Sequence, residues 1–136
     1  MQLLIYTSKL RIEQQSNVFS SFLATTEKIQ KENGFTGVLL YTGDIVLEIL
    51  EGETEKLTAF YESLSEDERF YDIEKLNTTE IAYSLFSDWS HEALFTDKEL
   101  SQKDIRELHI AYMENFDYDH MIFSEVLKIV ANVLLE

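Results

Sequence analysis

The residue with the clearest chemical potential in this sequence is Glu48, a carboxylate inside an apolar run. It lies in "GDIVLEILEG", directly between Leu47 and Ile49. Burial among apolar side chains disfavours the charged form of a carboxyl group and raises its pKa. The alternative is that Glu48 shares a solvent-facing stripe with Val46 and Leu50, because side chains alternate along a strand. Since those two residues are also apolar, we favour the buried carboxyl.

The remaining polar residues form no recognisable catalytic or metal-binding pattern. The chain has no cysteine, which excludes disulfides, thiolate nucleophiles and soft metal sites. His91, His109 and His120 are far apart, and none has a partner at metal-ligand spacing. Asp117 and Asp119 begin like a calcium loop, but the glycine and distal glutamate of that motif are missing. The sequence therefore predicts a protein that is not an enzyme and binds no metal.

The charge of the chain is strongly unbalanced. Its 136 residues include 11 basic and 26 acidic side chains, for a net charge of −15. Such a surface repels phosphate backbones, so we expect no nucleic-acid binding. The acidic excess favours solubility, and a basic protein partner is the alternative. No stretch approaches the roughly 20 apolar residues of a membrane span, and "MQLLIYTSK" does not resemble a signal peptide, so we expect a cytoplasmic protein.

Periodicity predicts the elements that position Glu48. Residues 2–7 suit a strand, and "SNVFSSFLATTEKIQKENG" suits a helix that begins at Ser16 or Asn17 and stops at Gly34. Residues 34–52 read as two strands joined by a tight turn at Gly43. One face of the predicted helix carries Phe19, Phe22, Leu23, Thr26, Ile29 and Gln30.

The second half of the chain continues the alternation. "ETEKLTAFYESLSEDER" suits a helix, and "YDIEKLNTTEIAYSLF" and "SDWSHEALF" suit two further strands. Helical patterns follow at about 100–114 and 119–135. The apolar face of the second predicted helix is formed by Leu57, Phe60, Tyr61 and Leu64.

This order predicts an α+β fold of the ferredoxin-like type, βαββαββ. Two helices then cover one face of an antiparallel or mixed sheet. We expect one domain over residues 1–95 and a helical extension over 96–136 packed on the other face of the sheet, which explains why both faces of the strands in 34–52 are apolar. The extension carries more apolar residues than one helix face needs, so we also expect a homo-oligomer.

Four stretches resemble, in order and spacing, the BLUF family of flavin-binding blue-light sensors. They are "LLIYTS", "GFTGVLLYTGDIVLEILEG", "DER" and "FSDWS". The resemblance covers about residues 1–95, and the helical patterns beyond are similar to those of the short, single-domain members. It implies that FAD lies between the first two helices, over the sheet. It also implies that light rearranges a hydrogen-bond network of tyrosine, glutamine and flavin, and that a separate signalling protein receives the change.

The resemblance assigns cofactor-binding positions residue by residue. Tyr6 matches the tyrosine of the first strand, and Trp89 matches a tryptophan of the fifth strand. Phe22 and Leu64 occupy the positions that flank the flavin ring. In the absence of flavin, Tyr6 and Trp89 would be ordinary packing residues.

Other positions depart from the family pattern. Glu48 replaces the glutamine, and a carboxylate only accepts hydrogen bonds, whereas an amide both donates and accepts. Ile29 and Gln30 replace asparagines, Ser63 replaces an arginine near the FAD phosphates, and His91 replaces a methionine. We therefore expect FAD binding to be weak or absent, with Ile29 filling the core of a collapsed pocket.

Two functions follow from these residues. The first is an FAD-dependent blue-light sensor that regulates a separate signalling protein. The second is a flavin-free module with the BLUF fold that serves interaction or assembly. The family resemblance favours the first function, and the residues at the flavin positions favour the second.

Overall fold

A computed structural model describes residues 1–12, 16–84, 86–93 and 103. Their strands and helices follow in the order β1 (Gln2–Leu10), α1 (Asn17–Glu32), β2 (Thr36–Thr42), β3 (Ile45–Gly52), α2 (Thr54–Leu64), β4 (Phe70–Glu80) and β5 (Trp89–Ala93). This confirms the predicted βαββαββ order. The fourth strand is shorter than the sequence suggested, because it ends at Glu80.

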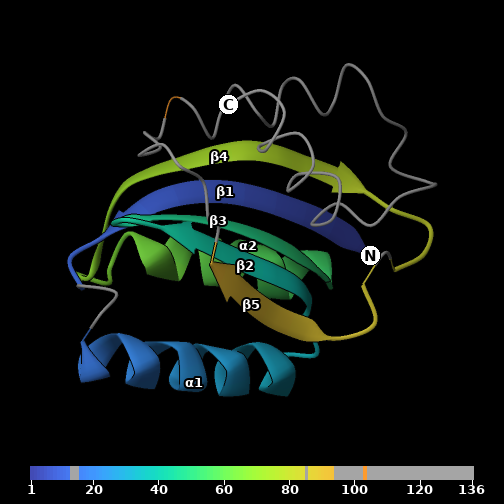
Figure 1. Cartoon of the computed structure of the whole chain (residues 1–136). Helices are drawn as coiled ribbons and strands as arrows, with labels where there is room; N and C mark the ends of the chain where they lie inside the picture. Colours follow the sequence, from blue (N-terminus) through green and yellow to red (C-terminus); the bar gives the residue numbers. More distant parts are fainter. Residues whose placement is uncertain (13–15, 85, 94–102, 104–136) are drawn as a thin grey trace, which may run out of the picture.

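The strands form a single mixed sheet in the order β4-β1-β3-β2-β5. β1 runs antiparallel to both β3 and β4, and β2 runs antiparallel to β3. β5 pairs with β2 in parallel and forms one edge of the sheet. Helices α1 and α2 lie on the same side of the sheet (Figure 1). The predicted ferredoxin-like α+β fold is therefore confirmed.

Two glycines make the β2–β3 hairpin possible. Gly43 has φ 58° in the tight turn between the strands, a backbone conformation that glycine adopts without strain. Gly37 has φ 145°, and a Cβ atom at this position would lie 1.9 Å from the carbonyl oxygen of Ile49. The "GFTG" stretch thus brings the backbones of β2 and β3 close together, directly beside Glu48.

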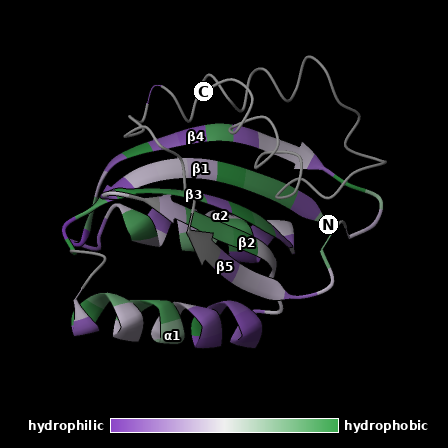
Figure 2. Ribbon diagram, in the orientation of Figure 1, coloured by the Kyte–Doolittle hydropathy of each residue, from purple (hydrophilic) through white to green (hydrophobic). Residues whose placement is uncertain are grey.

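Helix α1 covers the sheet mainly through its N-terminal half. The Ser16 side chain caps the helix by accepting a hydrogen bond from the Phe19 amide, as predicted. Apolar residues are concentrated in this half, whereas the C-terminal half is largely polar (Figure 2). The core between α1, α2 and the sheet includes Phe19, Phe22, Leu23, Leu57 and Leu64.

The polar half of α1 buries a glutamine instead of an isoleucine. Gln30 has no exposed surface, whereas Ile29 is 44% exposed, so the prediction that Ile29 fills the core is wrong. Gln30 follows Phe19 by 11 positions, about three turns at 3.6 residues per turn, and so points in the same direction. Helical geometry therefore turns Gln30 towards the sheet.

Several predictions concern parts of the chain outside the described residues. They are the helical pair after residue 95, its packing on the sheet, the domain boundary there, and the surface for self-association. His109, His120, Asp117 and Asp119 also lie outside. In the portion that the structure describes, no helix is long and apolar enough to cross a membrane.

Candidate functional site: a buried carboxyl network

Glu48 lies at the middle of β3 and pairs directly with Tyr6 on β1. Both residues are 1% exposed. The Tyr6 hydroxyl donates a hydrogen bond to Oε1 of Glu48 over 2.5 Å. Glu48 shares its face of β3 with Val46 and Leu50, but both of these residues are buried in the core beneath the helices. The prediction of a buried carboxyl is confirmed, and the solvent-facing alternative is wrong.

Two further donors reach the same carboxyl group from other elements. Gln30 on α1 donates from Nε2 to Oε2 of Glu48 over 3.1 Å. Trp89 on β5 donates from its indole nitrogen to the same oxygen over 3.0 Å. Helix α1 and strands β1, β3 and β5 therefore converge on one carboxyl group, and both of its oxygens accept hydrogen bonds from the protein.

Burial makes this carboxyl group a proton-exchanging group near neutral pH. Burial raises the pKa of Glu48 to about 7, although the hydrogen bonds from Tyr6, Trp89 and Gln30 act in the opposite direction. The pKa of Tyr6 is raised well above its usual value, first by burial and then by the neighbouring Glu48. Tyr6 therefore stays protonated as a donor while Glu48 changes its charge.

A cavity of about 140 Å³ adjoins the network between α1, α2 and the sheet. Its lining includes every predicted site residue except Trp89, namely Tyr6, Phe22, Ile29, Gln30, Glu48 and Leu64. Trp89 belongs to the network through its bond to Glu48. In Gln30, one of the lining residues, the Oε1 atom is buried and has no hydrogen-bond partner among the described protein atoms.

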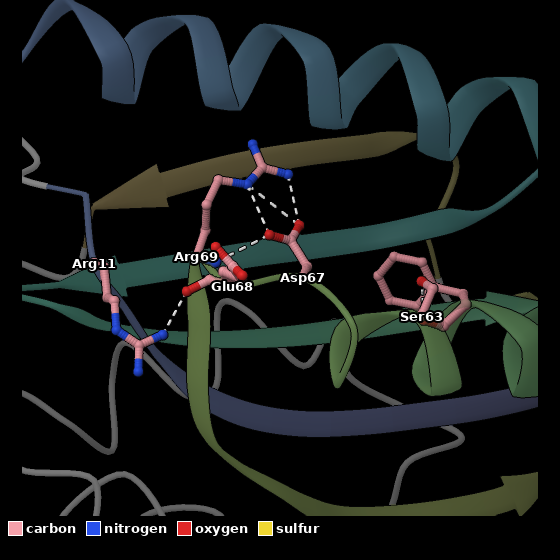
Figure 3. A network of polar contacts seen from close by, with 6 residues as sticks. Arg11, Ser63, Asp67, Glu68 and Arg69 are labelled. Atoms are coloured by element: carbon pink, nitrogen blue, oxygen red, sulfur yellow. Dashed lines mark hydrogen bonds and ion pairs between the residues drawn. The ribbon is translucent and has the colours of Figure 1, made fainter.

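The lining of the cavity also includes a positively charged side chain that was not predicted from the sequence. Arg69 lines the cavity and forms a bidentate pair with Asp67, with Nη2 at 2.7 Å from Oδ2 and Nε at 3.0 Å from Oδ1 (Figure 3). The pair lowers the pKa of Asp67. Ser63, which the family resemblance places at the position of an arginine, donates its hydroxyl to the Phe60 carbonyl at 2.6 Å. The "DER" stretch was the available signal for Arg69.

The rest of the site region offers no metal ligands in a cluster. Within residues 1–12, 16–84, 86–93 and 103, no three carboxylate or imidazole side chains gather closely enough to hold a metal ion. His91 lies on β5 with its ring 6.0 Å from that of Trp89. Its Nδ1 atom is buried and has no hydrogen-bond partner among the described protein atoms.

The comparisons with known proteins agree with this geometry. The family model described as "BLUF: Sensors of blue-light using FAD" matches residues 1–92. The chain belongs to the BLUF family. The matched residues include β1 to β4, α1 and α2, which form the described part of the fold together with β5.

Individual BLUF proteins are similar at modest identity. The blue light- and temperature-regulated antirepressor BluF of Escherichia coli K12 is 27% identical over 73 residues, which are 54% of this chain and 18% of BluF. The structure of BlsA in its photo-activated state is 27% identical and covers 99% of this chain and 95% of BlsA, with a TM-score of 0.62. A bacterial light-regulated adenylyl cyclase is also 27% identical, with a TM-score of 0.63 over 83% of this chain and 34% of the cyclase.

The residues of this BLUF site do not fit the flavin ring in the arrangement that the family resemblance implies. An ionised Glu48 offers only acceptors, and both of its oxygens already face protein donors. The cavity volume of about 140 Å³ is below the roughly 300–1,000 Å³ typical of pockets for drug-sized ligands. The positive charge of Arg69 in the cavity lining is neutralised by Asp67.

Proposed function

We propose that this chain is a non-enzymatic BLUF-family regulator that acts by contact with a separate protein and holds FAD weakly or not at all. The observation that carries the proposal is the Glu48 carboxyl group with three protein donors. The fold is that of the family, and all three hydrogen bonds to Glu48 come from side chains of the protein.

The chemistry of Glu48 supports this proposal. The implied light response requires an amide that exchanges its donor and acceptor ends, and a carboxylate has no donor end. Tyr6, Gln30 and Trp89 each donate a hydrogen bond to Glu48 and not to a ligand. A ligand with carbonyl oxygens meets a surface of acceptors when Glu48 is ionised, which is an unfavourable pairing.

A second candidate function is the FAD-dependent blue-light sensor of the family. The cavity lies between α1 and α2 over the sheet, where the resemblance places FAD. Its lining residues include Gln30, whose Oε1 has no hydrogen-bond partner among the described protein atoms. These observations favour some affinity for a flavin ring. The carboxylate of Glu48 nevertheless remains unsuited to the light response.

The flavin content of the purified protein distinguishes the two functions. After expression in a host with ample flavin, we expect a colourless protein or one with much less than one FAD per chain. The double variant Gln30→Asn with Glu48→Gln should increase the bound flavin, because it supplies the amides of the family. Glu53→Gln, at an exposed residue before α2, is the control. One FAD per wild-type chain, with absorption that shifts to the red in blue light, would contradict the proposal.

The proposed partner is another protein, and self-association is part of the proposal. The relative BluF is named an antirepressor, which supports action through another regulatory protein. The net charge of −15 favours a basic partner surface. We expect the full chain to form a homo-oligomer through its C-terminal residues. Light scattering at micromolar concentration tests this, and a monomer mass would contradict it.

A further inference from the structure

Only one of the two polar groups in the side-chain amide of Gln30 forms a hydrogen bond with a described protein atom. Its Nε2 donates to Glu48, while its Oε1 is fully buried and has no hydrogen-bond partner among the described protein atoms. We propose that Glu48 and Gln30 form a proton-operated switch. When Glu48 is ionised, Gln30 directs its N–H group to the carboxylate and leaves its carbonyl oxygen without a partner. When Glu48 takes up a proton, the amide turns over and exchanges the two groups.

Hydrogen-bond counting supports the exchange. A protonated carboxyl group carries a hydrogen that needs an acceptor, whereas its present partners all act as donors. The indole of Trp89 has no acceptor to offer. If the protonated carboxyl group donated to Tyr6, the buried Tyr6 hydroxyl would have to turn its own hydrogen away from Glu48. The unpartnered Oε1 of Gln30 is the acceptor that needs only a local movement.

The required movement is small. The oxygen and nitrogen of an amide exchange places by rotation about the terminal side-chain torsion, which has a broad and roughly two-fold profile. After rotation, Oε1 takes the position now held by Nε2, which is 3.1 Å from Oε2 of Glu48. A carboxyl O–H group reaches an acceptor at this position with a slight shortening of the separation.

The switch changes the hydrogen bonds inside the buried network. With Glu48 ionised, the unpartnered atom of the amide is Oε1 of Gln30. With Glu48 protonated, Oε1 accepts from the carboxyl group, and the N–H group of Gln30 takes the place that Oε1 now holds. The switch belongs to the protein itself and is therefore independent of the proposed weak flavin binding.

Other charged groups around Glu48 set the conditions for the switch. On β1, Tyr6 has a pKa raised well above its usual value and remains a donor. On α2, the ring of Tyr61 lies 6.0 Å from that of Tyr6, and burial raises the pKa of Tyr61. Asp67 and Arg69, which follow α2 in the chain and line the cavity, neutralise each other.

His91 is the neighbour that requires a control. Its ring on β5 lies 6.0 Å from the Trp89 ring, and histidine is the side-chain type that ordinarily changes charge near neutral pH. A variant His91→Leu separates any effect of the imidazole on Trp89 from the effect of Glu48.

An NMR titration of the full chain tests the switch without any ligand. Trp89 is the single tryptophan of the protein, so its indole N–H resonance is unambiguous. We expect this resonance and the side-chain amide resonances of Gln30 to titrate together, with a common midpoint of about 7. The two amide protons of Gln30 should exchange their environments across this midpoint. Both titrations should disappear in Glu48→Gln and persist in His91→Leu.

The wild-type spectra decide the proposal even if a variant does not fold. If Trp89 titrates while the Gln30 amide protons keep their environments, the proton does not turn the amide and the proposal is wrong. A pH-independent Trp89 resonance also overturns it. If the Trp89 titration is lost in a folded His91→Leu variant, the imidazole is responsible, and the proposal is again wrong.

Discussion

Tyr6 and Glu48 are directly paired across β1 and β3, and the tyrosine hydroxyl donates to Oε1 of Glu48 over 2.5 Å. Their proton affinities differ enough to fix the direction of this bond. The pKa of Tyr6 is raised well above its usual value, whereas burial brings the pKa of Glu48 to about 7. Near neutral pH the tyrosine therefore keeps its proton, and the carboxyl group is the member of the pair that titrates.

Tyr6→Phe should destabilise the protein most at alkaline pH. The change removes a hydrogen bond to a buried charged group, which is worth about 1.5–3 kcal/mol. The loss should be largest above pH of about 7, where Glu48 is ionised, and smaller in acid, where the carboxyl is neutral. Urea unfolding at several pH values measures it. Tyr61→Phe is the matched control, because Tyr61 is a neighbouring tyrosine that contacts Tyr6 edge to face.

Glu48→Gln should stabilise the protein at neutral and alkaline pH. The folded pKa of about 7 lies above the carboxyl's ordinary value of 4.5. Between these two values the native state binds more protons than the unfolded state, so the free energy of unfolding of the wild type falls as pH rises. The advantage of the raised pKa is complete below about 4.5 and is lost once pH has passed about 7.

The glutamine variant removes this pH-dependent loss. From the separation of the two pKa values we expect a gain of about 3 kcal/mol above pH of about 7, shrinking towards zero in acid. Denaturant melts of both proteins across the acid-to-neutral range measure the difference. A constant difference at all pH values would mean that Glu48 does not titrate in this range, contrary to its buried position.

The interaction between Tyr6 and Glu48 should appear as coupling in a double-mutant cycle. The two side chains touch, so the effects of Tyr6→Phe and Glu48→Gln should not add. We expect Tyr6→Phe to cost less in the glutamine background, because the carboxylate is then absent. Free energies of unfolding of the four proteins above pH of about 7 give the coupling, and strict additivity would show that the two sites are independent.

Hydrophobic patterning was sufficient to predict the buried carboxyl. The apolar neighbours of Glu48 on both faces of β3 leave it no solvent-facing side, and every residue of β3 is buried. The order of strands and helices along the chain, a cap at Ser16 or Asn17 and the turn at Gly43 were predicted from equally local signals. In each case a short stretch of sequence contains the physical cause of the structure.

The partners of Glu48 were harder to predict, because they depend on tertiary contacts. Hydrophobicity favours burial of Ile29 over Gln30, but Gln30 faces the carboxyl that needs a donor. The position of the Arg69–Asp67 pair in the cavity lining likewise depends on the folded structure, so residue spacing alone does not predict it. A second buried carboxylate, Glu51, was not singled out, because a strand-end glutamate beside glycine has no distinctive pattern.

Glu51 should hold the connection between β4 and β5 in place. Its Oε1 accepts hydrogen bonds from the Thr36 hydroxyl at 2.7 Å, the Ser84 hydroxyl at 2.7 Å and the Phe86 amide at 3.1 Å. Two of these donors belong to the segment that leads into β5 and hence to Trp89. A carboxylate with several donors on one oxygen fixes the backbone that carries them.

Glu51→Ala should therefore loosen β5 as well as destabilise the fold. Removing the acceptor leaves these donors without their bond, at a cost of about 1–3 kcal/mol. The movement of β5 should expose Trp89, which is 2% exposed in the wild type, and increase quenching of its fluorescence by acrylamide. Glu51→Gln keeps a carbonyl oxygen and should show a much smaller change, and Glu53→Ala at the exposed start of α2 should show none. If Glu51→Ala lowers stability but leaves the quenching of Trp89 unchanged, Glu51 supports the sheet without positioning β5.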